Sequence, residues 1–428
     1  MQRLWNNSAF RSVLYQAVVI GGIAWLFYVA VMNAVTNLRQ RGVSTGFSFL
    51  RNEAGISISE TPPIPSDLRR FLLFLLVLLL CLILFYCAKK FTPERIRKSR
   101  LLNGLWLVVF LALIAAVPNI GWTTYQPSDP YSAVLLTGMV NSLRVAAISA
   151  VGAVTLGFAL GICQLSTNAL LRNLVTLATE TARNVPLLLH ALFWYTVVLN
   201  SFPPVRASID IGSLFFLSNR GVFYPTIIAV NATALTTCLV AWAIAFVLAV
   251  RLRSPFVVKA AVCFAAIGAT VRFALELDVP RLSGFNFTQG GNLSPEQTAL
   301  VVGLVVYYAA FIADIVRSAI RAIPVGQWEG ASSLGLSRMA TIWLVIIPQA
   351  LRIIIPPLSN QMLGLVKDTS IGVAVAFPEF VAISRTVINQ TGQALEVMFV
   401  VMIFFLLINF SIAFGMNVYN RSIRFSER

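Results

Sequence analysis

Long apolar runs with few charges constrain this chain more than any other feature of its sequence. Hydrophobic residues make up 58% of the 428 residues and charged residues only 11%, whereas a soluble domain carries roughly 25% charged residues. A helix needs about 20 apolar residues to cross a bilayer, and in lipid only helices and closed barrels satisfy their own backbone hydrogen bonds. Because the runs have helical length, the sequence predicts an all-α, polytopic membrane protein.

About ten segments are long and apolar enough to be transmembrane helices. They cover residues 13–35, 69–88, 102–120, 133–163, 184–202, 223–250, 255–275, 296–321, 341–366 and 395–419. Basic loops stay in the cytoplasm, and one set of alternate loops holds nineteen Lys and Arg residues whereas the other holds nine. The richer set includes both termini and the loop around Glu329, which we therefore expect to be cytoplasmic.

The charge and the reactive residues argue against several other classes of function. The net charge is +16, but the basic residues lie scattered at helix ends and form no basic face with interleaved aromatics, so no nucleic-acid partner is expected. Contact with membrane lipid headgroups explains them better. The five cysteines form no Cys-x-x-Cys pair and His190 is the single histidine, so no metal site is expected. No Gly-x4-Gly-Lys-Ser/Thr sequence occurs, so no ATP-binding P-loop is expected in this chain.

Proline and glycine within the apolar spans predict local features of the helices. Pro348, Pro356 and Pro357 are expected to break the ninth span, and such a break is tolerated only beside protein or a water-filled cavity. Gly157 and Gly161 lie four residues apart, a spacing that lets two helices approach closely. We interpret these two glycines as packing residues.

A short polar stretch, residues 326–335, separates two strongly apolar segments and leads into Val345-Ile346-Ile347-Pro348. Pro324 lacks an amide donor and is expected to end the preceding helix, and Gly335 permits a turn. The stretch resembles the cytoplasmic coupling loop of ABC importer permeases, whose pattern is Glu-Ala-Ala, three residues, Gly, nine residues, Ile, any residue and Leu-Pro. Those places are occupied here by Glu329, Gly330, Ala331, Gly335, Val345, Ile347 and Pro348.

This resemblance implies a type I ABC importer permease core in a bacterial inner membrane. In that family the loop is a short helix that sits in a groove of an ATPase subunit. The implied ATPase-coupling residues are Gly326, Gln327, Glu329, Gly330, Ala331, Ser332, Gly335 and Pro348. The implied partners are an ABC ATPase dimer that carries ATP and Mg, a periplasmic substrate-binding protein, and a second permease that is either a related chain or another copy of this one. No cofactor is expected in this chain.

Motifs on both sides of the loop extend the resemblance to permeases of polar amino acids. Residues 141–144 resemble the opening of the family's core, and residues 180–188 its Glu-x-x-Arg-x-x-Pro-Leu-Leu element. Asp314 and Arg317 stand where the family usually has Glu-x-x-Arg. Residues 349–370 resemble the segment that follows the loop in histidine, glutamine and general L-amino-acid systems. Residues 41–55 resemble an external loop of the long general L-amino-acid permeases, which implies acidic and neutral polar L-amino acids as cargo.

The expected organisation has four parts. Residues 1–132 hold the first helix, an external loop and an extra transmembrane hairpin, and residues 133–202 begin the permease core. Residues 203–295 hold external loops and a second extra hairpin, and residues 296–428 complete the core with the coupling loop at about 322–340. Each extra pair of spans is expected to return to the side of the membrane from which it started.

Lys367 and Asp368 place two charges near the end of the ninth span. A charge near the bilayer centre costs roughly 2.5–3.5 kcal/mol, so such groups usually pair or line a polar route. Adjacent helical residues point about 100° apart, so these two cannot simply neutralise each other, but they offer partners for the carboxylate and ammonium of an amino acid. The alternative is that they only hold the outer end of the helix. The candidate substrate-pathway residues are Lys367, Asp368, Thr369, Ser370, Arg144 and Asn360.

The function predicted from these features is that of the membrane permease of an ATP-driven, binding-protein-dependent amino-acid importer, which is not itself an enzyme. The alternative is an ion-driven secondary amino-acid transporter, a class that typically shows inverted internal repeats, and the sequence shows none. A membrane enzyme would need a catalytic acid, base or metal set that is missing.

Overall fold

A computed structural model describes residues 8–40, 46–66, 121–229 and 275–423, together with Leu73, Val77, Leu80 and Cys81. The predicted span 102–120 lies outside these residues, as do nearly all of 69–88 and 255–275 and most of 223–250.

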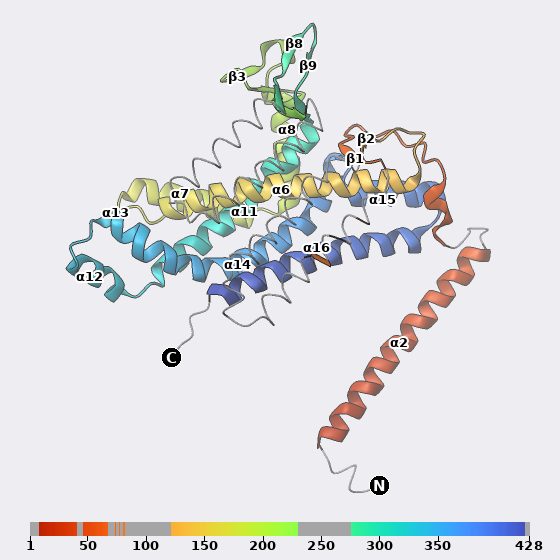
Figure 1. The fold of residues 1–428 in the computed structure, drawn as a ribbon, viewed down its shortest axis with the longest axis horizontal. Helices are drawn as coiled ribbons and strands as arrows, with labels where there is room; N and C mark the ends of the chain where they lie inside the picture. Colours follow the sequence, from red (N-terminus) through yellow and green to blue (C-terminus); the bar gives the residue numbers. More distant parts are fainter. Residues whose placement is uncertain are drawn as a thin grey trace, which may run out of the picture.

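Helices make up most of the described chain. The α-helices are α2 (Ser8–Gln40), α6 (Tyr131–Cys163), α7 (Ala169–Asn184), α8 (Leu187–Ser201), α11 (Pro295–Arg321), α12 (Val325–Ser333), α13 (Arg338–Thr341), α14 (Ile347–Asp368), α15 (Phe380–Thr391) and α16 (Ala394–Ile423). A π turn (Ile342–Ile346) joins α13 to α14, and 3-10 segments cover Phe47–Arg51, Val205–Ala207 and Thr369–Val375. Helices α6, α11, α14 and α16 run alongside one another, with α12 and α13 at one end of this bundle and β1, β2 and α15 at the other (Figure 1).

Five helical segments of the described chain are long and apolar enough to cross a membrane. They are Leu14–Asn37, Tyr131–Cys163, Pro295–Arg321, Met339–Val375 and Ala394–Val418. Helices α7 and α8 form a sixth candidate span that is bent by 108°. These segments coincide with the predicted spans 13–35, 133–163, 296–321, 341–366, 395–419 and 184–202, although α7 begins well before residue 184.

The expectation of an all-α chain is wrong for the segments between the spans, which contain short antiparallel strands. They are β1 (Pro63–Pro65), β2 (Trp122–Thr124), β3 (Ile209–Ile211), β4 (Phe215–Ser218), β5 (Gly221–Tyr224), β6 (Thr226–Ala229), β7 (Leu275–Asp278), β8 (Arg281–Ser283), β9 (Asn286–Thr288) and β10 (Gly291–Leu293). One sheet has the order β10-β5-β4-β3, and the pairs β1–β2, β6–β7 and β8–β9 are two-stranded.

The start of the predicted span 223–250 is one of these strand regions. Residues 223 and 224 end β5, and residues 226–229 form β6. Pro225, between the two strands, has no N–H to give to a helix, and the aromatic and β-branched residues around it fit a pleated strand. The helix predicted for residues 223–229 is therefore wrong.

Two of the strand pairs bring together the ends of the segments that the structure leaves undescribed. Pro65 of β1 pairs with Trp122 of β2, so residues 66 and 121 are neighbours. Ala229 of β6 likewise pairs with Leu275 of β7. The intervening residues lie almost entirely outside the described chain, so the expected return of each extra pair of spans to its starting side stays a prediction.

The closest helix contact is between α6 and α11, which run parallel. Gly157 of α6 lies against Ile312 and the Ala309 carbonyl, and an added Cβ would be 2.6 Å from the Ile312 Cβ. A Cβ at Gly161 would be 2.8 Å from the Ala313 carbonyl oxygen. The packing role predicted for the two glycines is confirmed. The main hydrophobic core forms around this contact, between α6, α8, α11 and α14.

A second contact fixes the other end of α6 to α15. The Asn141 side-chain amide donates to the backbone oxygens of Pro378 (3.0 Å) and Glu60 (3.1 Å). Glu379, between the spans 339–375 and 394–418, is fully buried and caps α15 by accepting from the Val381 and Ala382 amides at 2.8 and 2.6 Å. Burial raises the pKa of the Glu379 carboxyl to about 7. Asn141 thus joins α6 to the segment that precedes β1 and to the segment that precedes α15.

Replacing Gly157 with Ala tests the α6–α11 contact. The added methyl group overlaps Ile312, so we expect a loss of about 1–3 kcal/mol in the free energy of unfolding, measured as a lower midpoint of thermal unfolding in detergent. Gly22→Ala in α2, where an added Cβ meets nothing within 4 Å, is the matched control and should leave the midpoint unchanged or slightly raised. Equal midpoints for the two variants would contradict this packing.

Candidate functional site

The polar stretch predicted to couple to an ATPase forms the short helix α12. Helix α11 ends at Arg321, and Pro324 stands at the N-cap of α12 with extended backbone. The expected end of the preceding helix before Pro324 is thereby confirmed. Gly326, Gln327, Glu329, Gly330, Ala331 and Ser332 all lie on α12.

Gly335 ends α12 in a left-handed turn. Its φ is +73°, a conformation that costs a residue with a Cβ about 1–2 kcal/mol. The Leu336 amide donates to the Ala331 carbonyl (3.2 Å), and the Gly335 amide donates to the Ser332 carbonyl (3.0 Å). These two bonds define the Schellman motif, in which glycine is the usual residue at this position. The turn predicted at Gly335 is confirmed.

Helix α12 has one face against the bundle and one face open. Ala331 is buried, and Trp328 packs against the main core. Val325 is 68% exposed and Leu334 is 81% exposed, and Gly326, Glu329 and Gly330 on the same helix are also exposed. We call Val325, Gly326, Glu329, Gly330 and Leu334 the α12 surface. It combines apolar side chains, two glycines that allow close approach and one carboxylate.

A side-chain contact ties α12 to the segment that follows it. The Gln349 side-chain amide donates to Gln327 Oε1 (2.9 Å) and to the Val345 carbonyl (3.0 Å). Pro348 has no N–H for the Leu344 carbonyl, and the backbone widens into the π turn just before this proline. Such turns are frequent at functional sites. Gln327 and Gln349 therefore connect α12 with the start of α14.

The prolines within α14 do not break it. The helix runs without interruption from Ile347 to Asp368 through Pro356 and Pro357, so the predicted break is wrong at these two positions. Two adjacent prolines remove only the hydrogen bonds to the Arg352 and Ile353 carbonyls. The neighbouring Ile354 and Ile355 are buried in the bundle, which holds the helix in place.

One face of α14 is exposed and polar although the helix belongs to a candidate span. Arg352, Pro356, Asn360 and Lys367 are all exposed, and their spacings of four and seven residues place them on one side of a helix. We call these four residues the α14 polar face. Charged and polar side chains in a span usually face a water-filled cavity or another protein chain.

The other candidate residues at the end of α14 point into the bundle. The Tyr308 hydroxyl of α11 donates to Asp368 Oδ2 (2.6 Å). Thr369 is buried and its hydroxyl donates to the Val366 carbonyl (2.9 Å), while Ser370 is half-buried. Lys367 and Asp368 therefore lie on different sides of the helix, as their 100° separation predicts. No motif or spacing in the sequence indicated Tyr308 as the partner of Asp368.

Arg144 lies at a different level of the bundle from Asp368. Its guanidinium donates to the Tyr224 hydroxyl of β5, and Glu60, whose carboxylate accepts from the Ser294 amide (3.2 Å), is a neighbouring charge. Burial raises the pKa of the Glu60 carboxyl. Because α6 and α11 run parallel, Arg144 lies near the first turn of α11, about 16 Å along the helix from Tyr308 at 1.5 Å per residue. The structure does not bring these two candidate regions together.

The described residues contain no group of three His, Cys, Asp or Glu side chains that could hold a metal ion. Cys81 and Cys163, the cysteines in this part of the chain, are free thiols. The described residues of this region offer an exposed surface on α12 and a polar face on α14.

Residues 153–425 match a family model described as "Binding-protein-dependent transport system inner membrane component". The chain is 35% identical to the putative amino-acid ABC transporter permease protein YhdX of Escherichia coli K12, covering 99% of this chain and 96% of that protein. It is 31% identical to the general L-amino acid transport system permease protein AapQ of Rhizobium johnstonii, covering 98% and 94%. It is 29% identical to the glutamate/glutamine/aspartate/asparagine transport system permease protein BztB of Rhodobacter capsulatus, covering 100% and 97%.

Two glycines of α12 give opposite predictions for replacement with alanine. Gly335→Ala forces a Cβ into the left-handed region and should destabilise the end of α12 by about 1–2 kcal/mol. Gly330→Ala, where an added Cβ meets nothing within 4 Å, should stabilise the helix by about 0.5–1 kcal/mol. Limited proteolysis of the purified chain should then cut near α12 faster in the first variant and more slowly in the second. Equal cleavage rates would rule out the turn described here.

Proposed function

The chain belongs to the binding-protein-dependent transport system inner membrane components as an amino-acid ABC transporter permease, and we propose that it imports acidic and neutral polar L-amino acids by alternating access. In this proposal ATP hydrolysis on a partner ATPase dimer drives the interconversion of inward- and outward-facing states. A ligand or partner can shift such an equilibrium only through different affinities for the two states.

The observation that carries this proposal is the α12 surface. Its glycines and small side chains permit close approach by another protein, and Val325 and Leu334 provide apolar contacts. Glu329 provides a carboxylate for a basic residue of the ATPase. Trp328 and Ala331 transmit force because they pack against the bundle rather than extending into solvent.

The α14 polar face supports a pathway for the substrate. A single charge costs roughly 2.5–3.5 kcal/mol at the centre of a bilayer, so Arg352, Asn360 and Lys367 would be unfavourable against lipid. A second permease, either a related chain or another copy of this one, would face α14 and enclose a polar route between the two chains. Asp368, Thr369 and Ser370 lie at the end of this route.

The cargo is supported by the chemistry of the route and by the relatives. The ammonium of Lys367, on the α14 polar face, matches the carboxylate of an amino acid, whereas Asp368 is turned towards Tyr308 of α11. One relative is named for glutamate, glutamine, aspartate and asparagine, and another for general L-amino acid transport. Arg144, which lies about 16 Å along the bundle from Tyr308 at 1.5 Å per residue, is a further polar residue for this route.

The proposed setting is a bacterial inner membrane that the chain crosses about ten times, with both termini and α12 in the cytoplasm. The excess of basic residues in the loops on that side supports this orientation. ATP and Mg would bind to the ATPase chains, and a periplasmic substrate-binding protein would deliver the amino acid to the end that carries β1 and α15.

Uptake by proteoliposomes tests this function against the alternative of an ion-driven secondary transporter. We expect the chain, reconstituted with the ATPase and binding protein that co-purify with it, to import radiolabelled glutamate or glutamine only when ATP is present on the ATPase side. The chain alone should show no uptake under a sodium or proton gradient. Gradient-driven uptake by the chain alone would overturn the proposal in favour of a secondary transporter.

Thiol labelling tests whether the α14 polar face meets water. In a chain whose five cysteines are replaced with serine, we expect Asn360→Cys to react with a membrane-impermeant, charged thiol reagent in the assembled transporter. Phe410→Cys, at an exposed apolar position of α16, is the control and should react at least about tenfold more slowly because thiolates do not form in lipid. Equal labelling at both positions would argue against a pathway along α14.

A further inference from the structure

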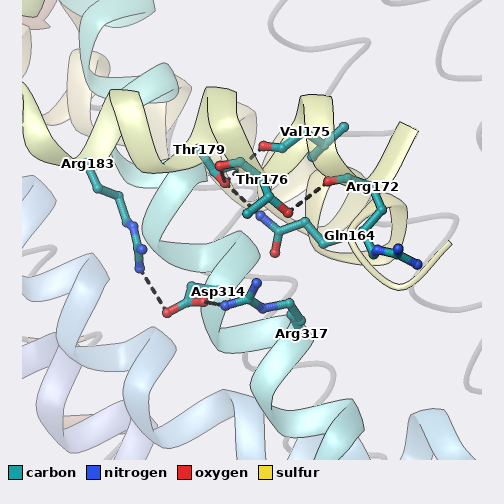
Figure 2. Close-up of polar contacts among 8 residues, drawn as sticks. All are labelled: Gln164, Arg172, Val175, Thr176, Thr179, Arg183, Asp314 and Arg317. Carbon is teal, nitrogen blue, oxygen red and sulfur yellow. Dashed lines mark hydrogen bonds and ion pairs between the residues drawn. The ribbon is translucent and has the colours of Figure 1, made fainter. Parts of the chain in front are cut away.

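A buried side-chain hydrogen bond holds α7 against the end of α6. The Gln164 side-chain amide, at the end of α6, donates to the Thr179 hydroxyl (2.7 Å), and both residues are buried (Figure 2). Asn168 caps α7 by accepting from the amides of Leu170 and Leu171. The start of α7 therefore has a fixed direction relative to α6.

A second hydrogen bond links α7 to α8 at the bend of 108° between them. Pro186 has no N–H, so the Ala182 carbonyl four residues earlier has no helical partner. His190 Nε2 lies 2.9 Å from that oxygen, and as an N–H donor it replaces the missing hydrogen bond. The His190 ring also packs edge-on against Tyr307 of α11, with 5.9 Å between the centroids.

Between these two hydrogen bonds, the carboxylate of Asp314 connects α7 with α11. Arg183 Nη1 of α7 lies 2.9 Å from Asp314 Oδ2, and Arg317 Nη2 lies 2.6 Å from Asp314 Oδ1. Figure 2 shows both guanidinium groups directed at the Asp314 carboxylate. Arg317 is on the same helix as Asp314, whereas Arg183 crosses from one helix to the other. Of these two ion pairs, therefore, only the one made by Arg183 links α7 to α11.

The position of Asp314 along α11 determines which part of that helix the ion pair attaches to α7. Asp314 lies two turns before the end of α11 at Arg321, and α12 begins four residues later at Val325. The neighbouring Ala313 is held against Gly161 of α6. The ion pair thus attaches α7 to the part of α11 that continues into α12.

We propose that Arg183 and Asp314 are positioning residues that make α7 move with α11, so that a displacement of α12 reaches the bend between α7 and α8. This inference rests on the proposed function, because it assigns a route for the force that α12 receives. The Arg183 and Arg317 side chains are 27% and 26% exposed, so losing either ion pair should leave the fold intact. Their equal exposure makes Arg317 a matched control for Arg183.

The test compares Arg183→Gln with Arg317→Gln in the reconstituted complex. We expect Arg183→Gln to lower the number of amino acids imported per ATP hydrolysed by about two- to tenfold, in the range of network couplings, while ATP hydrolysis continues. Arg317→Gln should keep the wild-type ratio, and Arg183→Lys should restore part of it because the positive charge remains. An unchanged ratio in Arg183→Gln, or an equal loss in both Gln variants, would overturn the proposal.

A second measurement separates this inference from the proposed function. Hydrogen exchange of the α7 amides in the purified chain does not require transport. We expect exchange in α7 to accelerate in Arg183→Gln and to stay at the wild-type rate in Arg317→Gln. If the wild-type complex imports nothing with ATP, the proposed function fails, and equal exchange in the two variants would then refute the positioning role as well.

Discussion

The close approach of α6 and α11 is the contact on which the rest of the described structure depends. Gly157 and Gly161 remove the Cβ atoms that would hold the two backbones apart, and helices in lipid associate mainly through such packing. The parallel pair then supports the other elements. Helix α14 packs against α11, α15 is bonded to one end of α6, and α7 is joined to α6 and α11 at the other end. Helix α12 begins four residues after the end of α11 and therefore follows directly on the helix pair around which the main core forms.

Charged residues make up only 11% of this chain, and the positions of its charged and polar groups explain how such a bundle can respond to a partner. Buried polar groups such as Asn141, Glu379 and His190 satisfy backbone groups at helix ends and bends, as a low-dielectric interior requires. Other polar groups stay exposed on α12 and on one face of α14. The first kind fixes the helices relative to one another, and the second kind is available to other molecules. This division is what a permease needs if it is to carry a displacement from an ATPase to a substrate route.

Local signals in the sequence predicted much of this arrangement. The six described spans follow from hydropathy alone, and the turn at Gly335 follows from the conformational freedom of glycine. The strands β5 and β6 were missed because an apolar run of β-branched and aromatic residues fits a helix and a strand equally well over a short length. The uninterrupted path of α14 through Pro356 and Pro357 was missed because the packing of Ile354 and Ile355 outweighs a local preference.

In the candidate site, too, local patterns in the sequence could not predict how the helices pack. The resemblance to the coupling loop implied a short helix at α12, but it could not indicate that Trp328 packs inward while Leu334 stays exposed. The ion pair of Arg183 with Asp314 and the hydrogen bond of Tyr308 with Asp368 join residues 131 and 60 positions apart. Such contacts depend on how the helices pack, and a single sequence carries no direct signal for them.

The central claim is that the α12 surface is where an ATPase acts on this chain. Site-specific photo-cross-linking tests it, with a photoreactive amino acid in place of Leu334 on α12, which is 81% exposed, or, as a control, in place of Phe285 between β8 and β9, which is 72% exposed. The account predicts that position 334 forms an adduct with the co-purified ATPase subunit and that position 285 does not. An ATPase adduct at position 285, or none at position 334, would contradict it.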